Sequence, residues 1–357
     1  MNKNNYVVIM AGGVGSRFWP YSRNTKPKQF LDILKTGRTL IQMTYDRFAP
    51  HVDEKNIYVV SNQEYKELIN EQLPELENEQ ILLEPFRRNT APCIAYACYK
   101  IQKSNPDAVI TVTPSDHMIF KDEAFLKSWN TSLDAASSQD KLITIGLKPH
   151  SPEVGYGYIQ FLETGNDVKK VKTFTEKPEK ALAEKFIESG DFVWNSGIFI
   201  WGVKAIISAF EESLPEMAEA FSEASASFFS NQEQKAVDDA YAQSTNISID
   251  YGIMEHSHCV YVVLGDFGWS DLGSWNTIYQ LSEKDNNGNS VQANALLYDT
   301  KNTLISAPED KLIVVQGLKD YLVTECDNVI LICKRNDEQK FRDFVSDVKE
   351  IKGKEFL

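Results

Sequence analysis

The feature that most constrains the fold is an alternation, up to about residue 150, of short apolar runs with segments of helical spacing. The apolar runs, rich in Val and Ile, predict buried strands over Tyr6–Met10, Ile57–Ser61, Ile81–Leu83, Ala108–Thr113 and Leu142–Leu147. The segments between them predict helices over Leu40–Phe48, Glu64–Leu73, Thr90–Ser104 and Asp122–Ser137. This alternation is typical of an α/β fold with a mainly parallel central sheet and helices on both of its faces.

Beyond residue 150 the pattern is mixed, and one polar, turn-rich run, Asp285–Ser290, is the best candidate for a domain boundary. Before it, we expect strands over 155–161, 171–176, Ile198–Trp201 and 259–265, with helices over Pro178–Ser189 and in three stretches of 203–243. After it, we expect strands over Ala295–Tyr298, Leu312–Val315, Tyr321–Val323 and Val329–Cys333, and a last helix over Glu338–Val348. The sequence therefore predicts a large domain over residues 1–285 and a small β-rich domain over residues 290–357.

The charge distribution indicates a small anionic ligand. The formal net charge is -14, which argues against general binding to nucleic acid or to an anionic membrane. Residues 1–50 nevertheless carry a balance of +6, from eight Lys or Arg and two Asp or Glu. A local basic site on an acidic protein suits a small, highly charged anion better than a polymer.

The cysteines and the lengths of the apolar runs indicate the cellular compartment of the protein. The five cysteines are odd in number and show no metal-site spacing, so we expect free thiols in a reducing environment. The first apolar run is too short for a signal peptide, and no apolar stretch approaches 18 residues. A cytoplasmic location is the expectation.

Three unusual segments each follow a predicted strand. They are the glycine-rich loop that begins at Ala11, the run Glu84–Thr90, and the run Pro114–His117. In open parallel sheets ligands bind beyond the carboxyl ends of the strands. We therefore expect these segments to meet at one edge of the sheet.

The glycine loop fits neither common nucleotide-binding motif. A dinucleotide fingerprint needs a third glycine where Phe18 stands, and the Gly-Lys-Ser/Thr of a Walker A loop is absent. What remains is a turn whose backbone N–H groups can approach phosphate oxygens, with Arg17 and Lys28 to neutralise them. The alternative is a tight strand–helix turn with solvated charges.

The loop GGVGSRFWPYSRNTKPKQF resembles the signature of the sugar-1-phosphate nucleotidylyltransferases, and more narrowly that of the bacterial mannose-1-phosphate guanylyltransferases (GDP-mannose pyrophosphorylases). The departures are small: Phe18 stands where Leu is usual, and His256 where Lys is common. The resemblance continues through EPFRRNTAP (84–92), TPSDHMI (113–119), GYGYI (155–159), FTEKPE (174–179), WNSGIF (194–199), SIDYGIMEH (248–256) and GWSDLGSW (268–275).

The resemblance implies a Rossmann-like nucleotidyltransferase domain followed by a short left-handed β-helix. It also implies transfer of GMP from GTP to α-D-mannose 1-phosphate, which gives GDP-mannose and pyrophosphate. The sugar phosphate is already an anion, so in-line attack on the α-phosphorus needs positioning, positive charge and Mg²⁺ (or another divalent cation) rather than a general base.

The catalytic residues that the resemblance implies are four. Arg17 and Lys28 hold the triphosphate and stabilise the leaving pyrophosphate, while Asp116 and Asp271 are the metal ligands. Two alternatives stay open from the residues themselves. Asp116 can be a turn-former through its own side chain, and Asp271 can be an N-cap for the segment that begins near Ser274.

The binding residues follow from the same resemblance. Lys177 and Asp271 serve the sugar phosphate, Glu176 and Asn195 read mannose hydroxyls, and the backbone at Gly157 passes close to the sugar. The nucleotide contacts are assigned to Ala11, Gly12, Gly13, Gly15, Ser16, Arg17, Lys28, Pro85, Asn89, Ser115 and Asp116.

Several of these residues have a structural alternative. Asn89 is equally good as a helix N-cap, Lys177 can be a solvated surface lysine, and Asn195 can make a local turn bond. Asp250 and Tyr251 begin a predicted helix and either contact substrate or only cap and pack, and packing is the favoured interpretation. Trp194, Phe199 and Trp201 are interpreted as core.

Two other functions remain possible at this level. One is another sugar-1-phosphate nucleotidylyltransferase, which uses UTP or dTTP with glucose 1-phosphate. The other is a silent homologue that binds sugar nucleotides and regulates a partner, and the presence of all four catalytic residues argues against it. By resemblance the chain is expected to form a homodimer.

Overall fold

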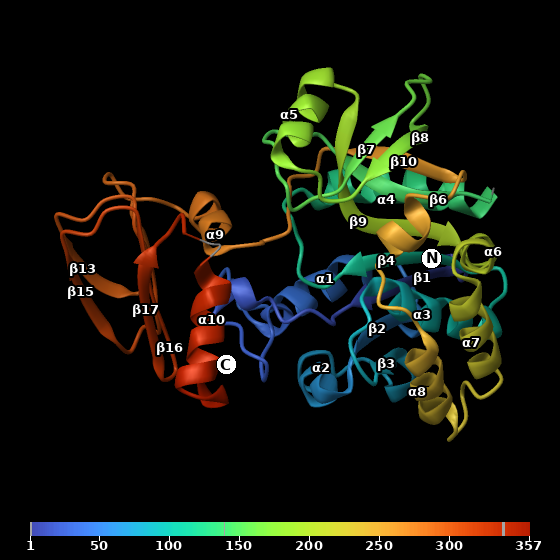
Figure 1. Cartoon of the computed structure of the whole chain (residues 1–357), viewed down its shortest axis with the longest axis horizontal. Coiled ribbons are helices and arrows are strands. Elements are labelled where there is room, and N and C mark those ends of the chain that lie inside the picture. Colours follow the sequence, from blue (N-terminus) through green and yellow to red (C-terminus); the bar gives the residue numbers. More distant parts are fainter. Residues whose placement is uncertain (1, 139, 338–339) are drawn as a thin grey trace. The chain divides into compact units, whose positions relative to one another are not determined.

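The computed structural model describes residues 2–138, 140–337 and 340–357, and the chain divides into two compact units (Figure 1). The first unit comprises Met1–Gly12, Thr44–Ser115 and Ile119–Trp269, and the second comprises Gly13–Met43, Asp116–Met118 and Ser270–Leu357. Each unit is described separately. No helix in the described ranges is long and apolar enough to cross a membrane.

Nine strands of the first unit form one sheet, counted over the described residues, in the order β3-β2-β1-β4-β9-β6-β10-β8-β7. The strands are β1 (Asn5–Met10), β2 (Ile57–Asn62), β3 (Ile81–Glu84), β4 (Val109–Pro114), β6 (Leu142–Leu147), β7 (Tyr158–Phe161), β8 (Val168–Thr175), β9 (Phe192–Gly202) and β10 (Val260–Gly265). The helices are α2 (Lys66–Gln72), α3 (Thr90–Ser104), α4 (Asp122–Ser138), α5 (Lys180–Ser189), α6 (Val203–Ser213), α7 (Pro215–Ser225) and α8 (Glu233–Gln243).

The prediction of a mainly parallel sheet is correct for one half of it only. Strands β3, β2, β1 and β4 run parallel, as do β6 and β10. Strand β9 is antiparallel to both β4 and β6, and β7 and β8 are antiparallel to their neighbours. The sheet is therefore mixed, since β7 and β8 are joined by a short connection that can reverse the chain but cannot carry a parallel crossover.

The first unit has three layers (Figure 1). Helices α3, α6, α7 and α8 pack with one face of the sheet in a large apolar core, to which β1 contributes Tyr6 and Val8. Helix α4 covers the other face, where Trp129 donates its indole N–H to Thr111 of β4 (2.8 Å). Burial on both faces explains why β1 and β2 read as continuous apolar runs rather than as alternating ones.

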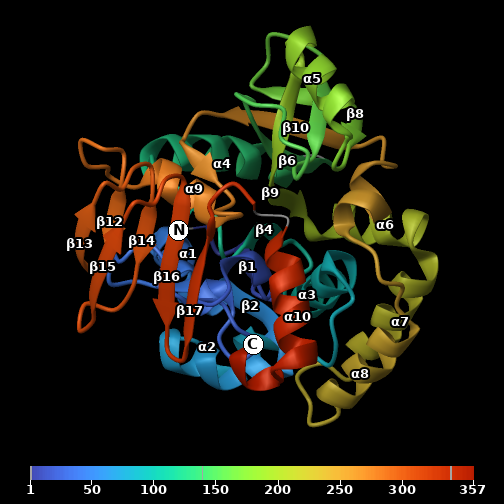
Figure 2. The ribbon, with the colours of Figure 1, turned by 60° about the vertical axis from the view of Figure 1, so that its left-hand side comes forward.

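The described residues of the second unit form short β-strands and helical segments (Figure 2). Its strands are β12 (Ser290–Gln292), β13 (Asn294–Tyr298), β14 (Leu304–Ser306), β15 (Leu312–Gln316), β16 (Tyr321–Cys326) and β17 (Val329–Lys334), and its helices are α9 (Trp275–Leu281) and α10 (Lys340–Ile351). Strands β12, β14 and β16 are parallel neighbours, β13 pairs with β15 in parallel, and β17 closes on β16 in antiparallel orientation. The predicted final helix is present, but its first two residues, 338 and 339, lie outside the described residues.

An apolar cluster joins the three chain segments of the second unit. It contains Phe18 and Trp19 from the glycine-loop segment, Met118, and Trp275 and Phe341 from α9 and α10. Three elements lie across chain positions where the units divide: α1 (Leu40–Phe48), β5 (Met118–Ile119) and β11 (Trp269–Ser270).

Candidate functional site

The ends of β1, β3 and β4 lie at one edge of the sheet, which confirms the predicted convergence of these three strands. β1 is a parallel neighbour of β2 and β4, and β2 is a parallel neighbour of β3. After β1, Ala11 N donates to Val60 O (2.8 Å), and Ser61 Oγ donates to Ala11 O (2.7 Å). Ser115, after β4, is buried and donates its N–H to Met10 O (3.0 Å).

A buried carboxylate, Glu84, stands at this edge beside the glycine loop. It ends β3, and its Oε2 would lie 3.2 Å from a Cβ placed on Gly12, so a glycine is the residue that leaves it room. Tyr241 donates its hydroxyl to Glu84 Oε1 (2.8 Å). Burial raises the pKa of Glu84 to about 7, against the opposing effects of that hydrogen bond and of Arg87. Glu84 is the first residue of the EPFRRNTAP motif, and the sequence alone predicts no role for it.

In the second unit, Lys28, Asp116 and Asp271 form what we call the lysine–aspartate cluster. Lys28 Nζ donates to Asp116 Oδ2 (2.9 Å) and to the backbone carbonyl of Asp271 (2.6 Å). The Lys28 side chain is 5% exposed, whereas that of Asp116 is 31% exposed. Three of the four predicted catalytic residues, drawn from distant parts of the sequence, therefore meet in one cluster.

The ionised form of Asp116 is the favoured one. Burial opposes ionisation, but the charges of Lys28 and His117 and the hydrogen bond from Lys28 outweigh it, so the pKa of Asp116 lies below its usual value. Asp271 Oδ1 accepts the N–H of Gly273 (2.9 Å), which fixes that carboxylate locally. The cap of α9 is Ser274, which accepts from Thr277 N (3.3 Å), so Asp271 is not the N-cap of this helix.

Asp116 and Asp271, the two predicted metal ligands, both contact Lys28, the first through its carboxylate and the second through its backbone carbonyl. Within the described ranges, no group of three or more such side chains gathers as a metal site. Mg²⁺ is commonly bound in this way, through one or two carboxylates plus substrate phosphates. Carboxylates are the ligand type that Mg²⁺ takes, whereas zinc commonly takes Cys and His ligands.

The glycine loop of the second unit shapes the surroundings of Lys28. Gly15 has a φ of 68°, and a Cβ at this position would overlap the Lys28 side chain. The Lys28 ammonium also lies 5.5 Å from the centre of the Phe18 ring. Arg17, in the short turn Ser16–Phe18, is exposed, and Gly13 and Ser16 are exposed as well. Glycine at position 15 is thus required for the lysine to reach Asp116.

In the first unit, Glu176, Lys177, Asn195 and Asp250 form what we call the carboxylate–amide cluster. Lys177 Nζ donates to Glu176 Oε1 (2.5 Å), and Asn195 Nδ2 donates to Asp250 Oδ1 (2.9 Å). Gly157 accepts the Asn195 N–H through its carbonyl (2.8 Å), and a Cβ on Gly157 would overlap Glu176 Oε2. The four residues of this unit that were predicted to bind the sugar phosphate, Gly157, Glu176, Lys177 and Asn195, therefore lie together. Asp250, which was not among them, contacts Asn195.

The electrostatics of this cluster couple its two carboxylates. Burial and the negative charge of Glu176 raise the pKa of Asp250 to about 6. Burial lowers the pKa of Lys177, but the hydrogen bond and the charge of Glu176 outweigh it, so this pKa is raised. Of the two alternatives for Asp250, packing and substrate contact, packing alone does not describe it, because its carboxylate accepts a hydrogen bond from Asn195, a predicted sugar-binding residue.

The remaining predicted residues include a helix cap, a residue at a strand end and buried core residues. Asn89 is the N-cap of α3 and accepts from Thr90 N (3.0 Å), with a φ of 66°. Pro85 lies directly after the end of β3. Trp194, Phe199 and Trp201 are buried, as the core interpretation predicts. Asn195 lies within β9, which is longer than the predicted Ile198–Trp201, and Gly197 N donates to its side-chain oxygen (3.2 Å).

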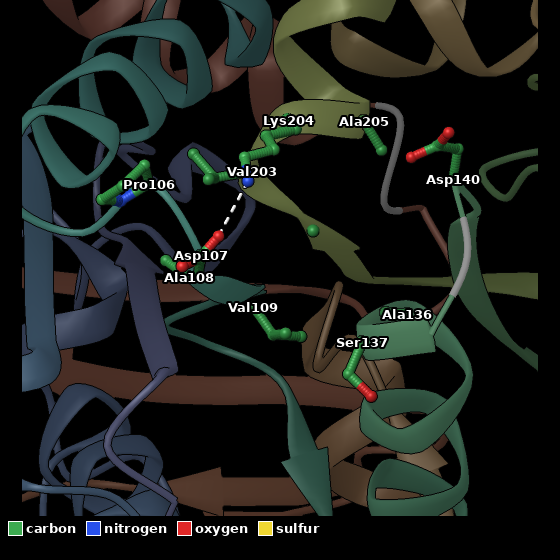
Figure 3. A pocket seen from close by; sticks show the side chains of 11 residues that line it. Pro106, Asp107, Ala108, Val109, Ala136, Ser137, Asp140, Val203, Lys204 and Ala205 are labelled. Atoms are coloured by element: carbon green, nitrogen blue, oxygen red, sulfur yellow. Dashed lines mark hydrogen bonds and ion pairs between the residues drawn. The ribbon is translucent and has the colours of Figure 1, made fainter.

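A separate hollow of about 310 Å³ lies where β4 begins and β9 ends (Figure 3). Asp107, Asp140 and Lys204 contribute its charged side chains, and Lys204 donates to Asp107 (2.7 Å). Because β4 ends at Pro114, this hollow is at the opposite end of the strand from Ser115. None of the predicted site residues lines it.

Comparison with known proteins extends over nearly the whole chain. The sequence profile of the family described as "Nucleotidyl transferase" matches residues 6–288. The chain belongs to this nucleotidyltransferase family. The fold and the enzyme class predicted from the sequence are thus correct at the family level.

Relatives with functional names are similar over most of their length as well. The chain is 38% identical over 345 residues to "Xanthan biosynthesis protein XanB" of Xanthomonas campestris pv. campestris (strain B100), covering 96% of this chain and 73% of that protein. It is 34% identical over 354 residues to "Mannose-1-phosphate guanylyltransferase" of Escherichia coli (strain K12), again covering 96% and 73%. A crystal structure of "mannose-1-phosphate geranyltransferase" from Thermus thermophilus matches with a TM-score of 0.85 at 28% identity, covering 97% of this chain and 99% of that one.

Proposed function

We propose that this nucleotidyltransferase transfers GMP from GTP to α-D-mannose 1-phosphate and releases GDP-mannose and pyrophosphate. The observation that carries the proposal is similarity across 96% of the chain to an E. coli protein named for the guanylyl transfer. The two side-chain clusters support it, because each unit supplies charges suited to part of this chemistry.

The second unit supplies the groups that handle the triphosphate in this proposal. Lys28 places a point charge, and Arg17 a planar fork, against the phosphate oxygens on which negative charge builds as pyrophosphate leaves. Asp116 and Asp271 would hold the divalent cation, which would supply positive charge against the phosphates. Exposure leaves the Arg17 side chain accessible to a phosphate.

The first unit supplies the groups that hold the sugar phosphate. Lys177 binds its phosphate. Glu176 accepts hydrogen bonds from sugar hydroxyls, and the Asn195 amide donates one to a sugar hydroxyl. Because the attacking phosphate oxygen is anionic at neutral pH, none of these residues has to remove a proton. Their work is orientation, which lowers the entropy cost of bringing two anions together.

The nucleotide contacts in the first unit are proposed for Ala11, Gly12, Pro85, Asn89 and Ser115. They follow β1, β3 and β4, whose carboxyl ends share one sheet edge. In open α/β sheets this edge is the usual ligand-binding position.

We also propose the domain boundary and the form of the C-terminal region. The family profile ends at residue 288, which supports a catalytic domain over residues 1–285 and a small domain over 290–357. Parallel pairing of β12 with β14, β14 with β16, and β13 with β15 supports a short left-handed β-helix. A crystal structure with a right-handed coil would contradict the second point.

Two further proposals concern the state of the protein. We propose a homodimer, supported by a row of exposed apolar side chains on β15 and β17. We propose a cytoplasmic, reducing compartment, supported by five free cysteines.

The decisive test is release of pyrophosphate from GTP, ATP, UTP and dTTP, each with mannose, glucose or galactose 1-phosphate, with and without Mg²⁺. The highest kcat/KM is expected for GTP with mannose 1-phosphate, and only with the cation. A highest kcat/KM for UTP or dTTP with glucose 1-phosphate would replace the proposal with that of another member of the family.

A further inference from the structure

The turn that begins at Asp250 is π-helical and contacts three parts of the carboxylate–amide cluster. It spans Asp250–Met254, and Glu255 N donates to Asp250 O (2.9 Å), the i→i+5 bond of a π-helix. Single π-helical turns are rare and are frequently found at functional sites. The i→i+5 bond brings residue 255 over residue 250, so that both side chains can serve the same surroundings.

The side chains of this turn hold the segment that carries Glu176 and Lys177. Glu255 Oε1 accepts the Glu176 N–H (3.0 Å), and the Tyr251 hydroxyl donates to the Glu176 carbonyl (3.4 Å). Lys177 has a φ of 48°, a conformation that a lysine adopts only when its surroundings impose it. The turn thus fixes the backbone from which both charged side chains project.

Asp250 fixes the third member, Asn195. The Asn195 side-chain oxygen accepts the Gly197 N–H (3.2 Å) and the Thr144 hydroxyl (2.9 Å), and its nitrogen donates to Asp250 Oδ1 (2.9 Å). A backbone N–H can only donate and a carboxylate can only accept, so Gly197 and Asp250 define which end of the amide is nitrogen. An amide nitrogen carries two hydrogens, and Asp250 takes one of them, so one N–H remains for a ligand.

We infer that Asp250 is a positioning residue for the sugar-phosphate site: by accepting one N–H of Asn195, it orients that amide so that the other N–H is presented to a sugar hydroxyl. The inference rests on the proposed function, since it takes Asn195 as a sugar-binding residue. Asp250 acts through Asn195 rather than on the reacting atoms.

The test is a mutational cycle on the pair with steady-state kinetics. Asp250→Ala is expected to raise KM for mannose 1-phosphate about tenfold, the loss expected of one oriented hydrogen bond, with KM for GTP within about twofold of wild type. Asp250→Asn keeps an oxygen that can accept from Asn195 and is expected to restore most of the affinity. Asp250→Ala in an Asn195→Ala background is expected to add less than about twofold, because the group that Asp250 orients is then absent.

A matched control separates positioning from loss of stability. Glu233 is another partly buried carboxylate of the first unit, which accepts from Tyr96 and Lys100 (both 2.6 Å). Glu233→Ala is expected to lower the Tm at least as much as Asp250→Ala while it leaves KM for mannose 1-phosphate unchanged. If Asp250→Ala fails to fold, Asp250→Leu in the same cycle, followed by isothermal titration with mannose 1-phosphate, gives the answer.

The outcomes distinguish this inference from the proposed function. A wild-type enzyme inactive with GTP and mannose 1-phosphate would overturn the proposed function. An active wild type whose KM values are unchanged by Asp250→Ala, or additive effects of Asp250→Ala and Asn195→Ala, would overturn the positioning role alone.

Discussion

Lys28 and Asp116 form a partly buried ion pair whose members the proposed chemistry uses separately, one for phosphate and one for the cation. Asp116→Asn keeps the shape of the side chain but removes its charge. It is expected to lower kcat by about 100-fold or more, because a metal ligand and the charge that holds Lys28 are both lost. Binding of Mn²⁺, measured by water proton relaxation, is expected to weaken in the same variant.

The matched control for Asp116 is again Glu233, whose Oε1 accepts from Lys100 Nζ at 2.6 Å. Glu233→Gln removes an ion pair of similar burial from a place with no assigned role. Its kcat and Mn²⁺ affinity are expected to equal those of wild type. Full turnover in Asp116→Asn would contradict the metal assignment.

Glu84 predicts a pH dependence of stability whose sign follows from its raised pKa. The folded protein holds the proton up to about pH 7, whereas the unfolded chain releases it near its ordinary value of 4.5. Between these values the folded state binds more protons, so stability falls as the pH rises and levels off above about pH 7. Glu84→Gln does not titrate, so the free energy of unfolding of the variant minus that of wild type is expected to rise by about 3 kcal/mol between pH 4.5 and pH 8.

Urea unfolding at a series of pH values measures this difference, and the other titrating groups cancel in it. Tyr241→Phe provides a second check, since the Tyr241 hydroxyl donates to Glu84 and opposes the rise in pKa. In Tyr241→Phe, the pH range over which the free energy of unfolding falls is expected to extend to higher pH. A variant-minus-wild-type difference that does not change with pH would contradict the titration of Glu84.

At the scale of elements, the N-terminus of α3 allows two predicted roles of Asn89, helix capping and nucleotide binding, to be tested separately. Asn89 caps this helix at a φ of 66°, so Asn89→Ala loses a cap and places alanine in a strained conformation. A loss of about 1–3 kcal/mol of stability is expected. Asn89→Gly removes the strain, and its loss is expected to be smaller. If Asn89 also contacts the base, both variants raise KM for GTP, whereas a pure capping role changes the Tm alone.

The sequence predicted the elements well where local pattern decides them. The bounds of α1, α3 and β6 agree to the residue, because each is a strongly periodic or a short, mainly apolar and wholly buried run. The antiparallel direction of β9 could not be predicted, since the apolar pattern of a buried strand is the same in either direction. Its extent was also underestimated, because Asn195, Ser196 and Gly197 weaken the apolar pattern of this strand.

In the candidate site, too, the residues that belong to sequence motifs could be predicted, whereas contacts across the fold could not. Lys28, Asp116 and Asp271, and likewise Gly157, Glu176, Lys177 and Asn195, were named from motifs, and the structure brings each set together. The hydrogen-bond partners of Asp250, Tyr251 and Glu255 across the fold were not predicted, although Asp250 and Tyr251 had been considered for substrate contact. Their residue types carry no ligand signal on their own, and only the π-helical turn gives them a common direction.

At the scale of the whole molecule, β15 and β17 carry an exposed apolar face, which is unusual for a protein that stays monomeric. Leu312, Val314, Ile330 and Ile332 are 57–71% exposed, and all four line one hollow. The members of each pair are two residues apart, so they share a face of their strand. Soluble monomers rarely expose a large contiguous apolar patch, and a second copy of the chain is the proposed cover.

Ile330→Lys together with Ile332→Lys is expected to convert the proposed homodimer into a monomer, because two charges cannot be buried unpaired against an apolar face. Light scattering after size-exclusion chromatography measures the mass. Ile351→Lys is the matched control, since Ile351 is 72% exposed on α10 and lies outside this hollow. The control is expected to leave the mass unchanged. A wild-type chain that is monomeric at all concentrations, or a double variant that remains dimeric, would show that this face is not the contact between copies.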